Sequence, residues 1–152
     1  MKKIISLKNL KKIIKKLKKL KKKIVFTNGC FDILHIGHIK LFKKAKTYGD
    51  ILIVGLNSDD SVRRLKKSGR PIMPQRERSE IVSSIEYVDY LTIFNEDTPI
   101  ELIKEIKPDV LIKGADYKLK EIVGSDIVPK TIRFKLIKGK STTSLLEKIK
   151  NL

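Results

Sequence analysis

The chain has 152 residues, a length that fits one domain with a buried core. Its single cysteine, Cys30, excludes an intrachain disulfide, and no apolar run is long enough for a membrane-spanning helix. The 35 basic residues exceed the 17 acidic ones, and the net charge of +18 raises the question of a nucleic-acid partner. The basic N-terminus lacks the continuous apolar segment of a signal peptide, so we expect a protein of the reducing cytoplasm.

The positive charge is concentrated at the N-terminus. Residues 1–23 hold 12 lysines and no acidic residue, which accounts for two thirds of the net charge. A compositional preference for lysine at solvated positions explains such an excess, and the rest of the chain is only mildly basic. We therefore expect small-molecule substrates and no nucleic-acid partner.

Apolar residues in the same segment recur at three- and four-residue spacing, which predicts an amphipathic helix. Asn9 is the residue expected to interrupt it. The simplest interpretation is a basic helical extension over residues 1–23 that packs on the domain with its lysines in water. Binding to an anionic membrane surface or to nucleic acid is the alternative, because a basic amphipathic helix serves either purpose. The apolar stripe consists of Ile4, Leu7, Leu10, Ile14 and Leu17, with Ile13 and Leu20 beside it.

From residue 24 onward, short apolar runs alternate with helical patterns. Strands are predicted at 24–26, 51–56, 88–94, 110–112 and 131–137. Helices are predicted at 38–48, 59–67, 75–85, 99–107 and 142–149. This alternation predicts an α/β fold, a Rossmann-like doubly wound parallel sheet that forms a single domain over residues 24–152. Ligands bind beyond the carboxyl ends of the strands in such sheets, so the loops after the strands are the candidate site.

The loop after the first predicted strand carries the only two histidines of the chain, His35 and His38, on either side of Gly37. At the start of a helix, unpaired backbone N–H groups and the helix dipole attract anions, and Gly37 permits a close approach. Both histidines can donate hydrogen bonds to one polyphosphate. Zinc is the competing interpretation, but only Cys30 is available as a further nitrogen or sulfur ligand. The pattern therefore favours a polyphosphate site.

These residues carry a resemblance. The string Gly-Cys-Phe-Asp at 29–32, followed by His-Ile-Gly-His at 35–38, resembles the HxGH signature of the cytidylyltransferase-like nucleotidyltransferase superfamily. Further strings, chiefly Glu-Asp-Thr-Pro at 96–99 and Lys-Gly-Ala-Asp-Tyr at 113–117, resemble one branch of it, D-glycero-β-D-manno-heptose 1-phosphate adenylyltransferase. That branch occurs alone or as the C-terminal domain of a bifunctional heptose kinase and adenylyltransferase. The resemblance covers nearly everything from Ile24 to the C-terminus.

Two departures bear on the branch. Ala115 replaces the glycine expected in the heptose enzymes. Residues 136–140 lack the arginine-bearing segment that precedes the corresponding Ser-Thr-Thr in glycerol- and choline-phosphate cytidylyltransferases. The second departure argues against the cytidylyltransferase branch and leaves phosphate contacts to lysines.

The resemblance implies in-line transfer of AMP from ATP to a sugar 1-phosphate, with release of pyrophosphate and with Mg²⁺ neutralising the polyphosphate. The residues it assigns to catalysis are His35, His38, Lys66 and Arg78. Those assigned to the nucleotide are Thr27, Asn28, Gly29, Phe31, Gly37, Lys113, Gly114, Asp116, Ser141, Thr142 and Thr143. Those assigned to the acceptor are Asp32, Asn57, Lys67 and Arg70. No residue is assigned to a protein-bound metal.

Alternatives remain at this stage. Within the superfamily, an FAD synthetase or a glycerol-3-phosphate cytidylyltransferase differs only in its substrates. In another class stands a lysine-rich protein that binds nucleic acid or a membrane surface. Ser141 is equally well placed to cap a helix, and Lys66 and Lys67 to be solvated. The resemblance further implies a homodimer and a separate sugar kinase in the pathway.

Overall fold

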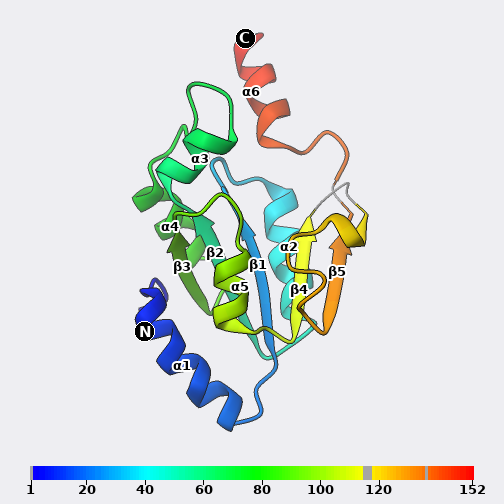
Figure 1. The fold of residues 1–152 in the computed structure, drawn as a ribbon. Coiled ribbons are helices and arrows are strands. Elements are labelled where there is room, and N and C mark those ends of the chain that lie inside the picture. The colour runs from blue at the N-terminus through cyan, green and yellow to red at the C-terminus, as the bar shows by residue number, and fades with distance from the viewer. Residues whose placement is uncertain (1, 115–117, 136) are drawn as a thin grey trace.

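The computed structural model describes residues 2–114, 118–135 and 137–152. Five parallel strands form one sheet in the order β3-β2-β1-β4-β5 (Figure 1). The strand order reverses beside β1, and the loop after β1 carries both histidines, so they lie where such sheets bind ligands. The predicted α/β fold with a parallel sheet is confirmed. The strands are β1 (Ile24–Gly29), β2 (Ile51–Asn57), β3 (Tyr90–Phe94), β4 (Val110–Gly114) and β5 (Lys130–Phe134).

Helices cover both faces of the sheet. On one face α2 (Ile36–Lys46) and α4 (Gln75–Ser83) enclose a core that includes Val25 and Phe42. On the other face α1 (Leu7–Lys19) and α5 (Ile100–Ile106) enclose a core that includes Leu10 and Phe26. Neighbouring residues of β1 thus enter opposite cores, because successive side chains of a strand point to opposite faces. This double burial explains why the strands read as continuous apolar runs.

The N-terminal segment differs from the prediction in two ways. Ile4 lies outside the helix and forms a parallel bridge with Leu91 at the β3 edge, where the Ile5 N–H donates to the Leu91 carbonyl at 2.9 Å. The Ser6 hydroxyl accepts the N–H of Asn9 and caps α1. This cap fixes the helix start after Ile4 and places Asn9 inside the first turn, so Asn9 does not interrupt the helix.

Other boundaries differ by a few residues. The second helix begins at Ile36 rather than 38, because His35 caps it. The third strand begins at Tyr90 rather than 88, since the Asp89 carboxylate turns to accept the N–H of Leu52 at 2.7 Å. The helices α3 (Asp59–Leu65) and α4 end two residues early, and β5 stops at Phe134.

The C-terminal helix α6 (Thr142–Lys150) projects beyond the carboxyl ends of the strands (Figure 1). None of its residues is buried. Between β4 and β5 lies one short 3₁₀ helix, η1 (Leu119–Glu121). In the described part of the chain, no helix has the length and apolarity needed to cross a membrane.

Candidate active site

The two histidines form hydrogen bonds with the backbone at the start of α2. Nδ1 of His35 accepts the N–H of Gly37 at 3.1 Å, and the His35 N–H donates to Nδ1 of His38 at 3.3 Å. The rings stack with their centroids 3.9 Å apart. Because each Nδ1 is an acceptor, each neutral ring carries its proton on Nε2. The loop therefore presents two Nε2–H donors side by side.

Burial keeps both rings neutral. Desolvation lowers the pKa of His35 below its usual value. Burial, together with the repulsion that a protonated His35 would exert on a second positive charge, lowers the pKa of His38 from 6.5 to about 4. At neutral pH the pair can thus donate hydrogen bonds to an anion without itself carrying full positive charge.

Two glycines make room for the side chains of this loop. A Cβ on Gly37 would lie 2.8 Å from Cε1 and 2.9 Å from Nδ1 of His35. A Cβ on Gly29 would lie 2.9 Å from Cζ of Phe31, whose ring meets His38 edge-on with centroids 5.3 Å apart. Gly37 was predicted to admit an anion. The structure shows that it admits the His35 ring.

Arg78 is a buried brace beneath the loop, with a residue exposure of 1%. Its Nη1 donates to the carbonyls of Cys30 at 2.6 Å and Asn57 at 2.9 Å, and its Nε donates to Met73 O at 3.0 Å. Its Nη2 donates to Oδ1 of Asp59 at 2.7 Å. The guanidinium therefore joins the ends of β1 and β2 to the loop before α4, instead of presenting a free charge to a substrate.

Asp32 fastens the loop before α4 to the histidine loop. Its buried carboxylate accepts the N–H groups of Ile72 and Met73 at 2.9 Å and pairs with Nε of Arg70. Burial raises the pKa of Asp32, but these hydrogen bonds and the Arg70 charge outweigh it, so the pKa is lowered. Asp32 was predicted to contact the acceptor, yet its oxygens are already engaged by the protein. Asn57 was also predicted to contact the acceptor. Its buried Nδ2 instead donates to Ser61 Oγ at 2.9 Å, within the protein.

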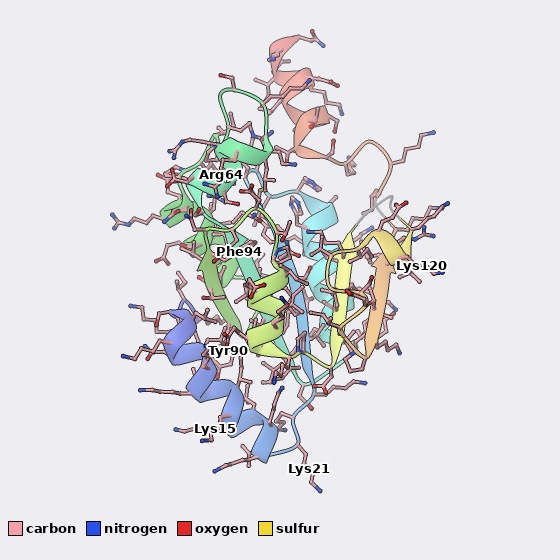
Figure 2. The ribbon with its side chains drawn as sticks, viewed as in Figure 1. Lys15, Lys21, Arg64, Tyr90, Phe94 and Lys120 are labelled. Carbon is pink, nitrogen blue, oxygen red and sulfur yellow. The ribbon has the colours of Figure 1, made fainter. Side chains whose placement is uncertain are left out.

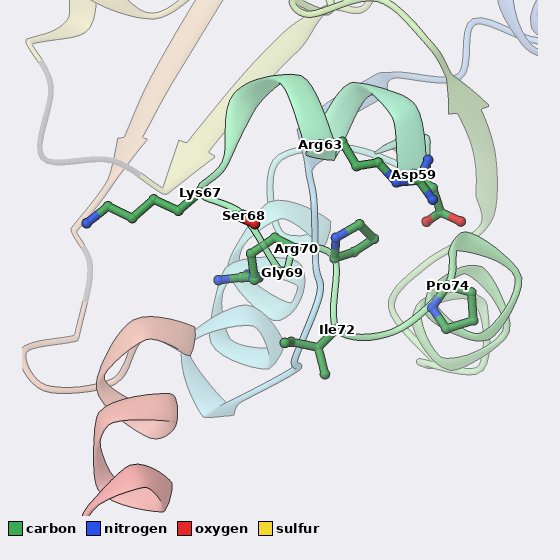
Figure 3. A pocket seen from close by; sticks show the side chains of 9 residues that line it. Asp59, Arg63, Lys67, Ser68, Gly69, Arg70, Ile72 and Pro74 are labelled. Carbon is green, nitrogen blue, oxygen red and sulfur yellow. The ribbon is translucent and has the colours of Figure 1, made fainter.

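A hollow of about 620 Å³ lies along the segment from α3 to α4 (Figure 3). It includes Lys67 and Arg70, both predicted from the sequence. Arg70 also pairs with Asp32, so the hollow adjoins the histidine loop. The lining residues Asp59 and Arg63, in the first and last turns of α3, were not predicted as site residues; their charge on the helix that follows β2 was the available signal. The full lining is Asp59, Arg63, Lys67, Ser68, Gly69, Arg70, Pro71, Ile72 and Pro74.

Lys113 links two central strands. Its Nζ donates to the carbonyl of Asn28 at 2.8 Å, across the point where the strand order reverses. Burial lowers the pKa of Lys113 to about 8; Cys30 raises it and the charge of the exposed Lys66 lowers it further. This brings together three predicted residues, Asn28, Lys113 and Lys66.

The other residues assigned to the nucleotide have different surroundings. Thr27 is fully buried, and its Oγ1 has no hydrogen-bond partner within the described residues. Gly114 ends β4. Asp116, together with Ala115 and Tyr117, lies outside the described residues.

A hydrogen bond joins the start of α6 to the histidine loop. The Thr142 hydroxyl donates to the carbonyl of Ile33 at 3.1 Å. Ser141 caps the helix, its Oγ accepting the N–H of Ser144 at 3.1 Å, while Thr143 is exposed. Over the described residues, no three His, Cys, Asp or Glu side chains gather closely enough to hold a metal ion.

The histidine loop thus presents two ring N–H donors at the switch point of a parallel sheet. A sequence profile of the cytidylyltransferase-like family matches residues 26–144. The chain belongs to the cytidylyltransferase-like family. The predicted enzyme class, a nucleotidyltransferase, agrees with this family.

Within the cytidylyltransferase-like family, the chain is similar in sequence to bacterial HldE proteins. The bifunctional protein HldE of Nitratiruptor sp. is 58% identical over 130 residues, which cover 86% of this chain and 28% of that protein. The bifunctional protein HldE of Campylobacter concisus is 54% identical over 149 residues, covering 98% of this chain and 31% of the relative. The chain thus spans about three tenths of the length of these relatives.

Solved structures agree on the fold. A lipopolysaccharide core biosynthesis protein from Thermoplasma volcanium superimposes with a TM-score of 0.66 at 30% identity, over 77% of this chain and 99% of that one. Pantoate-beta-alanine ligase from Francisella tularensis superimposes with a TM-score of 0.65 at 22% identity, over 98% of this chain and 72% of that one, and supports the fold alone.

Proposed function

We propose that the chain transfers AMP from ATP to D-glycero-β-D-manno-heptose 1-phosphate, producing an ADP-heptose and pyrophosphate. The observation that carries the proposal is the pair of neutral histidines whose Nε2–H groups stand together at the switch point. The choice of substrates is supported by the resemblance to the heptose branch and by sequence identities of 58% and 54% to two HldE proteins.

In this reaction an oxygen of the acceptor phosphate attacks the α-phosphorus of ATP in line. A new P–O bond forms while the bond to the β-phosphate oxygen breaks, and the electron pair leaves with pyrophosphate. Negative charge grows on the α-phosphate and on the leaving group, where His35 and His38 donate from Nε2. Preorganised donors of this kind supply most of the catalysis in reactions that need little covalent help from the protein.

We assign the remaining predicted residues to the parts of the substrates around this centre. The backbone N–H groups of Thr142 and Thr143, which start α6 behind the Ser141 cap, suit the outer phosphates of ATP. The end of β4, with Lys113 and Gly114, and the following Asp116 are assigned to the nucleoside, together with Thr27, Asn28, Gly29 and Phe31 at the end of β1. Mg²⁺ accompanies ATP, since it prefers phosphate and water oxygens to a protein cage.

The acceptor is assigned to the hollow beside α3. Lys67 and Arg70 line it and supply positive charge for a sugar phosphate, and the neighbouring Lys66 is near enough for its charge to lower the pKa of Lys113. Asp32 and Asn57 hold this region in place through their buried contacts, and Arg78 positions the histidine loop. We assign the enzyme to the cytoplasm, where ATP is available, as a homodimer supplied with acceptor by a sugar kinase.

The test is a release assay. The full chain is incubated with Mg²⁺, each of ATP, CTP, GTP and UTP, and each of heptose 1-phosphate, glycerol 3-phosphate and FMN, while pyrophosphate is measured. ATP with heptose 1-phosphate is expected to give the highest kcat/KM. A preference for CTP with glycerol 3-phosphate, or for ATP with FMN, contradicts the substrate assignment, and no release with any pair contradicts the proposed activity.

A further inference from the structure

The side of α1 that faces away from the sheet is almost entirely lysine. Leu10 and Ile14 are 0% and 5% exposed and pack in the core beside Phe26. With 3.6 residues per turn, the positions opposite these two are 8, 9, 12, 15, 16 and 19. Position 9 is an exposed asparagine at the edge of this side, and the other five are exposed lysines. We call these five the lysine face: Lys8, Lys12, Lys15, Lys16 and Lys19.

Among the described residues, no ion pair reaches the lysine face. Residues 1–23 contain no acid, and the ion pair seen at α1 joins Glu105 to Lys11, at the side of the helix. Lys18 donates to the carbonyl of Lys107 at 2.9 Å, which again uses a flank. Figure 2 shows Lys15 extending from α1 away from the body of the molecule, with Lys21 at the end of the helix.

The lysine face lies far from the chemistry. Figure 1 shows α1 toward the amino ends of the strands, whereas α6 and the histidine loop are at the carboxyl ends. A partner that covers α1 therefore leaves the candidate active site open. The helix is also held rigidly, because its apolar stripe is already used against the sheet.

We propose that the lysine face binds the surface of an anionic lipid bilayer. The fixed row of lysines complements a layer of negatively charged headgroups, which attracts polybasic segments without needing a defined ligand geometry. Nucleic acid fits less well, because residues 1–23 contain neither an arginine to grip phosphate in a fork nor an aromatic ring to stack on bases. Since Leu10 and Ile14 are occupied in the core, the binding is electrostatic and superficial, with the 69% exposed Leu20 beside it.

The experiment is sedimentation of the full chain with two kinds of vesicle, phosphatidylcholine alone and phosphatidylcholine mixed with phosphatidylglycerol. Binding is expected only to the anionic vesicles and is expected to disappear as salt is raised. Each lysine near such a surface contributes about a fivefold gain in partitioning, so the triple variant Lys8→Gln, Lys12→Gln, Lys15→Gln loses about a hundredfold.

A matched variant controls for net charge. Lys43→Gln, Lys120→Gln, Lys135→Gln removes the same charge from exposed positions outside α1 and is expected to bind almost as wild type. Pyrophosphate release is expected to stay unchanged in both variants. The proposal is overturned if both triple variants lose binding equally, if phosphatidylcholine alone binds as well, or if duplex DNA or RNA binds through the lysine face while anionic vesicles do not.

Discussion

The two helix starts predicted to bind phosphate, at α2 and at α6, share a reciprocal cap but offer an anion different donors. In α2 the histidine rings accept the backbone N–H groups, so the Nε2–H groups of His35 and His38 are the donors. In α6 the Ser141 and Ser144 hydroxyls accept each other's backbone N–H groups, which leaves the N–H groups of residues 142–143 as the donors. The difference teaches that side chains should matter greatly at α2 and little at α6.

The α2 site depends on its buried support, and removing that support has the largest expected effect. Arg78→Met leaves the carbonyls of Cys30, Asn57 and Met73 and the Asp59 carboxylate without their donor. We expect the free energy of unfolding to fall by about 3 to 5 kcal/mol, measured by urea denaturation.

The matched control is Arg63→Gln, which removes an exposed ion pair with Asp60. It should change the free energy of unfolding by about 0.5 kcal/mol or less. Equal destabilisation by the two substitutions would show that Arg78 is not a brace.

Removal of one donor at α2 is expected to reduce turnover nearly as strongly. His38→Ala should lower kcat about 100- to 1,000-fold, the usual effect of losing one preorganised donor to a charged transition state. The measurement is steady-state pyrophosphate release, with the melting temperature as a check on folding. A variant that keeps full activity would rule out the proposed role of His38.

A substitution that displaces the His35 ring tests the geometry of the α2 start while keeping both histidines. Gly37→Ala keeps both histidines but places a methyl group within 2.9 Å of the His35 ring. We expect kcat to fall about 10- to 100-fold through misplacement of that ring. Because alanine favours a helix over glycine, the melting temperature should not fall. Unchanged kcat would show that the observed position of His35 is not the working one.

The α6 start provides the smallest expected effect. Ser141→Ala removes a cap worth about 1 kcal/mol to the helix but leaves the backbone N–H groups in place. We expect kcat to change less than about tenfold, because the anion is met by the backbone. A loss as large as that of His38→Ala would mean that the Ser141 hydroxyl itself contacts the phosphates, and the contrast between the two helix starts would fail.

Local patterns predicted much of this structure, and contacts between distant segments account for the rest. The alternation of apolar runs and helical stretches gave the parallel sheet, and the paired histidines gave the site. The bridge from Ile4 to Leu91 and the contact of Lys113 with Asn28 depend on strand order, which no single segment encodes. The family resemblance assigned Arg78 to catalysis. Its bracing contacts could not be predicted, because its four partners come from segments that are separate in the sequence.

The same limit applies to the hollow. The positive charge at and beside the Ser-Gly-Arg-Pro turn was enough to predict Arg70 and Lys67. The hydrogen bond from the Ile72 N–H to Asp32 appears only in the fold. A carboxylate next to a catalytic motif is a natural candidate for substrate binding. Its burial against backbone N–H groups gives it a different role here.

The most direct test of the account is ¹⁵N NMR of the histidine rings, which is simple because the chain has only two. Both should be neutral Nε2–H tautomers at pH 7, and His38 should titrate near its lowered pKa of about 4 instead of 6.5. Since the unfolded ring takes up a proton first, the free energy of unfolding should fall as pH is lowered from 6.5 toward 4. An imidazolium or an Nδ1–H tautomer at pH 7 would contradict the proposed donor pair.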